Sequence, residues 1–274
     1  MSEAEAQNRA VGGARPRVPE PMVMHDPEAA AAFHRAGSGS GPLVPLYEVC
    51  ARGIGKLLGP GGRTFDLGSG SGRFLAYLSR RRPDAELVGL ELSQSMLELG
   101  ERMLASEGLS DRVRLIRGDM TSCSELVPDD LGLISCMLAL HQLPSAVELE
   151  GALAQVAQIR ERTGCAIWLA DIVRLQDDSA MQDWMAATPD PDPPFWQDAF
   201  ASEAAGWTQA ELTAALEQAG LEDLHHAVSP LLQVHWAPAR GREPQADGAW
   251  QEHELPAEVR GPVIALRMAM RGLP

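Results

Sequence analysis

The chain has 274 residues, enough for one buried core with appendages, and its 38 acidic residues outnumber its 23 lysines and arginines, giving a formal charge of −15. Proteins that bind nucleic acid usually carry a basic surface, so this balance disfavours DNA and RNA as partners. The four cysteines form no C-x-x-C pair, and the chain shows neither a signal peptide nor an apolar run of about 18 residues. We therefore expect buried free thiols, no metal site, no membrane contact and a cytoplasmic location.

The first part of the chain divides into a tail and a helix. Residues 1–23 are polar and show no hydrophobic period, which predicts a disordered tail. Asp26 followed by Pro27 is typical of an N-cap and first helical turn, and the helix that follows should end at Gly37.

A second helix is predicted over 43–58, and the pentapeptide Gly-Ser-Gly-Ser-Gly at 37–41 joins it to the first. A flexible connector is one interpretation of this joint. The other is the hinge of a helical lid formed by residues 24–58 over a reaction site, because many reactions benefit from excluding water. Such a lid could bring three side chains to a site: Phe33, His34 and Tyr47.

From residue 63 onward, strand and helix patterns alternate. The predicted strands lie near 63–67, 86–91, 112–117, 130–137 and 164–173. The predicted helices lie near 72–82, 94–107 and 145–162. This alternation predicts an α/β fold with a doubly wound, mostly parallel sheet, helices on both faces and a ligand at the carboxyl ends of the strands.

A second Gly-Ser-Gly-Ser-Gly, at 68–72, connects the first strand to the next helix. Glycines allow positive φ angles and a close approach of a ligand, and the helix start offers free N–H groups. Glu91 ends the following strand at about the 20-residue offset where nucleotide-binding folds place a carboxylate on ribose hydroxyls. These features predict a nucleoside-binding half-domain.

The segment from Asp66 to Gly72 resembles the first motif of the class I S-adenosylmethionine-dependent methyltransferases. Glu91 and the residues after it are similar to that family's second motif, Asp119 to its third, and residues 131–144 to the strand and loop that line the methyl-transfer site in members acting on small molecules. The resemblance implies a seven-stranded Rossmann-like sheet, S-adenosylmethionine as cofactor and a small-molecule acceptor as partner. The cofactor-binding residues that it implies are Asp66, Gly68, Ser69, Gly70, Gly72, Glu91, Leu92, Met96, Asp119, Met120 and Met137.

Two residues are candidates for catalysis. His141 lies just past the fourth strand on the cofactor edge and titrates near neutral pH, which suits a general base. A structural histidine that caps the loop is the alternative. Asp171 closes the fifth strand on the same edge and could act as a base or anchor a cationic acceptor. Weaker candidates, which the sequence does not place, are His34, Tyr47, His225, His226 and His235.

Residues 59–274 are expected to form the methyltransferase domain, with an insertion at 174–206. The insertion carries Asp-Pro repeats among aromatic residues, which favours a cover over the substrate, with a packed surface subdomain as the alternative. A helix is expected at 208–219 and strand-like structure at 221–237. The pattern leaves 262–271 open between a final strand and a short helix.

The most favoured function is S-adenosylmethionine-dependent methyl transfer to a small molecule, such as a natural-product intermediate or an amino or hydroxy metabolite. No Asn-Pro-Pro-Tyr or Asp-Pro-Pro-Tyr element follows the fourth strand, which disfavours methylation of base amines and glutamine. One alternative is a methyltransferase-like protein that uses bound S-adenosylmethionine in a non-methylating or structural role. A nicotinamide-dependent oxidoreductase is less favoured, because Arg73 stands where G-x-G-x-x-G needs glycine. The acceptor atom and the oligomeric state stay open.

Overall fold

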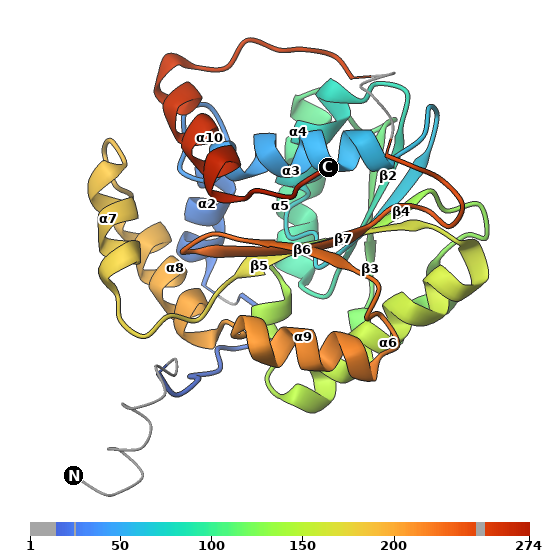
Figure 1. Cartoon of the computed structure of the whole chain (residues 1–274). Coiled ribbons are helices and arrows are strands. Elements are labelled where there is room, and N and C mark those ends of the chain that lie inside the picture. Colours follow the sequence, from blue (N-terminus) through green and yellow to red (C-terminus); the bar gives the residue numbers. More distant parts are fainter. Residues whose placement is uncertain (1–14, 25, 245–249) are drawn as a thin grey trace, which may run out of the picture.

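One seven-stranded sheet runs through the molecule in the computed structural model, which describes residues 15–24, 26–244 and 250–274 (Figure 1). The strand order is β3-β2-β1-β4-β5-β7-β6, and only β7 and β6 add antiparallel pairings. The strands are β1 Arg63–Leu67, β2 Glu86–Glu91, β3 Val113–Arg117, β4 Leu133–Met137, β5 Ala166–Ile172, β6 His225–Val228 and β7 Leu232–Ala237. The predicted doubly wound, seven-stranded sheet is confirmed.

Helices cover both faces of this sheet (Figure 1). On one face lie α3 Val44–Leu57, α4 Arg73–Arg81, α5 Gln94–Ser106 and α10 Ala257–Ala269. On the other lie α6 Ala146–Thr163 and α9 Gln209–Gln218. Because β4 and β5 are covered on both faces, every residue in them is buried, which is why they appear in the sequence as continuous apolar runs.

The packing of α3 on the sheet depends on a glycine in the middle of the helix. The indole of Trp168 on β5 is fully buried, and a Cβ on Gly53 would lie 2.1 Å from it. Gly53 therefore allows the helix to approach the sheet closely, although glycine lowers helix propensity.

The insertion is helical. It forms α7 Ser179–Ala187 and α8 Pro193–Ala205, and the first helix of the chain, α2 Pro27–Ala36, packs against α8. Trp184, Phe195 and Trp196 pack edge to face with centroid separations of 4.8–6.1 Å, so part of the insertion's aromatic content fills its own small core.

The structure of the C-terminal residues answers the question that hydrophobic periodicity left open, whether they form a strand or a helix. Residues 262–269 belong to α10, a helix that ends at Ala269, and the last two strands of the sheet come from the hairpin of β6 and β7. Three short 3-10 turns complete the described structure: Met120–Ser122, Ser124–Leu126 and Leu140–Gln142. No helix in the described ranges combines the length and the apolar character needed to span a bilayer.

Two expectations for the start of the chain differ from the structure. Residues 15–23 are packed against the domain by hydrogen bonds, whereas 1–14 lie outside the described residues. The pentapeptide at 37–41 is a tight, packed turn in which Gly41 donates to the Ser38 carbonyl, and a Cβ on Gly41 would lie 2.3 Å from the Ala36 oxygen. Hinged movement of residues 24–58 stays a prediction.

Candidate active site

The glycine turn between β1 and α4 has three glycines with positive φ: Gly68 at 65°, Gly70 at 55° and Gly72 at 67°. A Cβ on Gly68 would lie 2.5 Å from that of Ala139 and 2.9 Å from the Met120 methyl carbon. Gly72 has another task, because it precedes α4 and faces Leu115 of β3 rather than a pocket. The turn thus keeps backbone exposed at the carboxyl edge of the sheet.

We expect Gly68→Ala to weaken cofactor binding about tenfold or more, because an added Cβ strains the backbone and displaces the wall formed by Ala139. Gly61→Ala is the matched control: its φ is 64°, and nothing lies within 4 Å of the position of its Cβ. Calorimetric titration of both variants with S-adenosylhomocysteine checks the prediction. Equal losses in the two variants would contradict it.

The central pocket is lined by the glycine turn and by residues at the ends of β1, β2 and β4, among them Asp66, Glu91, Met96 and Met137. Asp66 is buried, and its Oδ1 accepts a 2.6 Å hydrogen bond from Ser135, while its Oδ2 has no partner. Burial raises the pKa of Asp66 to about 7, with the Ser135 bond opposing and Glu91 adding to the rise. The free oxygen suits a ligand that brings a hydrogen-bond donor.

Glu91 lies beneath the glycine turn and accepts hydrogen bonds from backbone N–H groups. Its Oε2 accepts a 2.8 Å hydrogen bond from the Gly70 N–H and its Oε1 a 2.7 Å bond from the Ser93 N–H. Burial raises the pKa of this carboxyl, and the backbone donors oppose the rise. Glu91 therefore fixes the turn and, because each oxygen keeps a second lone pair, can still accept from ligand hydroxyls.

A side pocket adjoins the central pocket and shares Gly68 and Glu91 with it; Leu92, Asp119 and Met120 line its far end. Asp119 accepts 2.8 Å hydrogen bonds from both the N–H and the hydroxyl of Thr121, so it also caps the 3-10 turn that follows. Asp119 therefore both caps this turn and lines the side pocket. The two pockets together bring around one cleft every cofactor residue implied by the motifs except Gly72.

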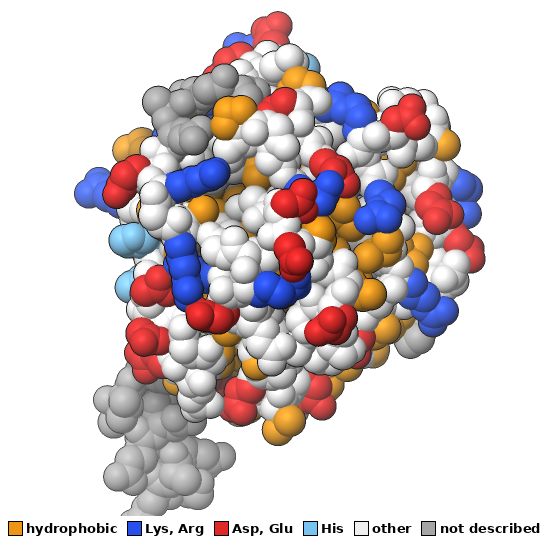
Figure 2. Space-filling view, turned by 90° about the vertical axis from the view of Figure 1, so that its right-hand side faces the viewer, with side chains coloured by type: hydrophobic (Ala, Val, Ile, Leu, Met, Phe, Trp, Pro, Cys, Tyr) orange, Lys and Arg blue, Asp and Glu red, His pale blue; other side chains and the backbone are white. Residues whose placement is uncertain are grey.

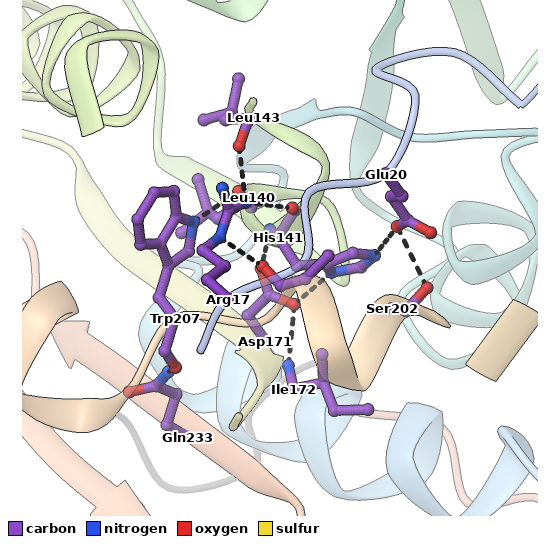
Figure 3. Close-up of polar contacts among 11 residues, drawn as sticks. Arg17, Glu20, Leu140, His141, Leu143, Asp171, Ile172, Ser202, Trp207 and Gln233 are labelled. Atoms are coloured by element: carbon purple, nitrogen blue, oxygen red, sulfur yellow. Dashed lines mark hydrogen bonds and ion pairs between the residues drawn. The ribbon is translucent and has the colours of Figure 1, made fainter. Parts of the chain in front are cut away.

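His141 and Asp171 form a buried pair at the rim of the central pocket (Figure 3). The Nδ1 of His141 lies 2.6 Å from Oδ1 of Asp171, and the His141 N–H donates to Oδ2 at 2.8 Å. The Nε2 lies 3.2 Å from Oε1 of Glu20. Burial lowers the pKa of the imidazole, but the two carboxylates outweigh burial and raise it to about 10.

Glu20 belongs to a segment that the sequence left without structure, here called the N-terminal strap, residues 15–24. Arg17 anchors it by donating to the backbone carbonyls of His141, Leu143, Pro144 and Ala205 at 2.7–2.9 Å (Figure 3). Its guanidinium also stacks on Trp207, 3.8 Å from the ring centroid. The same segment places Met22 in the wall of the side pocket and Met24 in that of the central pocket, so the strap lies across the cleft.

Comparison with known proteins identifies a methyltransferase domain within the chain. The profile of a family described as a methyltransferase domain matches residues 65–164, which contain most of β1, the glycine turn and β2 to β4. This part of the chain is similar to S-adenosylmethionine-dependent methyltransferases. This agrees with the sheet order and with the cofactor that the motifs predicted, and it removes support from the nicotinamide alternative.

Individual curated proteins match short segments of the chain. A carboxy-S-adenosyl-L-methionine synthase of Campylobacter jejuni is 36% identical over 70 residues, 24% of this chain and 30% of that protein. Ribosomal RNA small subunit methyltransferase C of Stutzerimonas stutzeri is 45% identical over 60 residues, 22% of this chain and 18% of that protein. The solved structure of a candidate S-adenosylmethionine-dependent methyltransferase from Methanococcus maripaludis shares the fold with a TM-score of 0.59 at 16% identity, covering 82% of this chain and 99% of that one. The chain thus spans less than a third of the length of either curated relative.

Beside the cleft formed by the central and side pockets lies a second space, here called the apolar cavity, with a volume of about 470 Å³. It extends from the central pocket to α7, α8 and α10. The residues that line both spaces are Phe33, Leu138, His141, Asp198 and Ser202. Sequence reasoning missed Asp198 and Ser202, which lie on α8; the Asp192-Pro193 step that starts this helix is the signal that could have placed it.

The weaker candidates fall into two groups. His34 lies near the cleft, and its ring is within hydrogen-bond distance of Ser71 and Arg73. Burial, together with the charge of Arg73, lowers the pKa of His34 to about 4. Tyr47 is buried and lines the central pocket. The structure does not bring the histidines of β6 and β7 to the cleft, namely His225, His226 and His235. Within the described ranges, no group of three or more His, Cys, Asp or Glu side chains is arranged to hold a metal.

Proposed function

We propose that this protein transfers a methyl group from S-adenosylmethionine to a small-molecule acceptor, with His141 as the general base. One observation carries the proposal: the buried His141–Asp171 pair stands where the cofactor cleft meets the apolar cavity. Both the methyl donor and an acceptor would reach this junction, each from its own side.

The groups around the cleft suit the cofactor's chemistry. Bound S-adenosylmethionine supplies a methyl group already activated on a sulfonium sulfur. Asp66 offers its unpartnered oxygen to a donor such as the ammonium of the cofactor, Glu91 accepts from ribose hydroxyls, and Asp119 closes the side pocket for the base. Gly68 and Gly70 leave the space that side chains would fill.

The role of His141 follows from its two ring nitrogens. Because Nδ1 faces Asp171, it keeps its proton, and Nε2 is the nitrogen that can accept one from a hydroxyl or ammonium group. Asp171 orients the ring and stabilises the imidazolium that forms, and its Oδ2 also holds the His141 backbone. A nucleophile held in line with the methyl group then reacts without further activation.

The alternative acceptor is RNA, which one relative is named for. Against it stands the cavity: no lysine or arginine lines it among the residues that the structure describes. The face shown in Figure 2 carries acidic and basic side chains side by side rather than a basic stripe, and the net charge is −15. These charges support a small-molecule acceptor.

A second candidate function keeps the cofactor but not methyl transfer. The similarity to a carboxy-S-adenosyl-L-methionine synthase favours a protein in which S-adenosylmethionine itself is modified or serves a structural role. Mass spectrometry of the nucleoside products separates the two, because methyl transfer yields S-adenosylhomocysteine in equal amount with a methylated acceptor.

The decisive experiment is calorimetric titration of the full chain with S-adenosylmethionine, S-adenosylhomocysteine, NAD and NADP, followed by an acceptor screen with isotopically labelled methyl donor. We expect binding of the first two compounds alone and label transfer to a small molecule. Binding without transfer to any acceptor, together with a modified nucleoside product, would replace the proposal with the second candidate.

A further inference from the structure

The size and the lining of the apolar cavity suit a small hydrophobic ligand. Its volume of about 470 Å³ falls within the range of small-molecule sites, about 300–1,000 Å³. Aromatic and aliphatic side chains from separate elements form its walls, including Phe33 of α2, Trp184 of α7, Phe195 of α8 and Leu266 of α10. Such a surface gains free energy by removing apolar area of a ligand from water, so it selects a hydrophobic body.

The polar groups of the cavity gather at its junction with the central pocket, where His141, Asp198 and Ser202 line both spaces. The Asp198 carboxylate accepts no hydrogen bond within the described part of the chain. The pKa of Asp198 is raised to about 6, mainly by burial, with nearby Glu20 adding to the rise and His141 opposing it. A partly buried carboxylate without a donor gains from a ligand that brings one.

The charged groups at the junction determine which ligand charge is favoured there. Asp198, Glu20 and Asp171 surround a single imidazole, and Asp183 lies farther along the wall on α7. A carboxylate or phosphate entering here would meet like charge at low dielectric with no lysine or arginine among the described lining residues. An ammonium or hydroxyl group would instead donate to Asp198.

We infer that the apolar cavity binds the hydrophobic body of an acceptor whose polar head is cationic or uncharged, and that Asp198 selects against an anionic head. The inference rests on the proposed function, because it takes the acceptor to reach His141 through this cavity. It goes further by naming the acceptor's chemical class, which is amphipathic, and the residue that reads its charge.

Three probes with one apolar body test this selection: naphthylethylamine, naphthylethanol and naphthylacetate. Calorimetric titration at pH 7.5, with S-adenosylhomocysteine present, should give binding of the amine and the alcohol and about tenfold weaker binding of the carboxylate. Asp198→Asn should narrow the gap between amine and carboxylate. Asp190→Asn is the matched control, because this carboxylate is exposed and does not line the cavity, so its loss should leave the gap unchanged.

A second pair of variants locates the binding. Ala265 is exposed on α10 and lines the cavity, so Ala265→Trp should block all three probes without disturbing the core, whereas Ala257→Trp, on the same helix outside the cavity, should not. Equal binding of the three heads, failure of every probe to bind, or binding that survives Ala265→Trp would each overturn the inference. S-adenosylhomocysteine titration of the same samples reports on the proposed function separately, so the cavity and the methyl-donor site can fail independently.

Discussion

His141→Ala should lower kcat by about 10²–10⁴-fold, the range that a general base contributes, while leaving the affinity for S-adenosylhomocysteine nearly unchanged. The ring is buried, with Nδ1 on Asp171 and Nε2 3.2 Å from Glu20, and His141 lines both the central pocket and the cavity. Removing it deletes the acceptor of the substrate proton but none of the groups that face the cofactor from β1 and β2. The measurement is steady-state turnover of the acceptor found by screening, beside calorimetric titration with S-adenosylhomocysteine.

A buried histidine can also matter only for folding, so this variant needs a matched control. His235 on β7 is likewise buried, and its ring lies near Gln233 and the ring of His226, away from the residues that line the cleft. His235→Ala should therefore change the thermal midpoint but not kcat, and His141→Gln should remain folded with low turnover. Equal losses of turnover and cofactor affinity in His141→Ala would assign the residue a structural role.

The parts of the site that lie within the β-α-β pattern were predictable from sequence. The glycine turn, Glu91 and Asp119 are each placed at a strand end by hydrophobic period and turn chemistry, both of which are local. Parallel strands then bring those ends to one edge. Local signals therefore sufficed to assemble the cofactor cleft.

The strap could not be predicted this way. Its sequence has no period, and it is held by contacts with residues more than 120 positions later: Arg17 donates to carbonyls of the loop after β4, and Arg15 pairs with Asp178 and Glu203. Asp198 was missed for a related reason, because its position at the cavity depends on the packing of α8 against α2. Contacts between distant segments carry no periodic signal in either partner, so the acceptor side of the site emerges only from tertiary structure.

The strap leads to the second prediction, that Glu20→Gln raises turnover at neutral pH by about tenfold for each unit by which the pKa of His141 falls. With Asp171 on one ring nitrogen and Glu20 on the other, the imidazole has a pKa of about 10 and is protonated at pH 7. A protonated ring cannot accept a proton, so turnover should increase with pH up to about 10. Removing the Glu20 charge removes one of the two carboxylates that raise the pKa, and the rising limb of the profile should move to lower pH.

The measurement is kcat/KM between pH 6 and pH 10.5 for the wild-type chain, Glu20→Gln and Glu28→Gln. Glu28 is an exposed carboxylate at the start of α2, so its variant controls for the loss of one negative charge from the same end of the chain. An unshifted limb in Glu20→Gln would mean that the strap leaves the ring before the acceptor is bound. A shifted limb would show that Glu20 stays beside the ring and holds His141 in its protonated form in the enzyme that meets the acceptor.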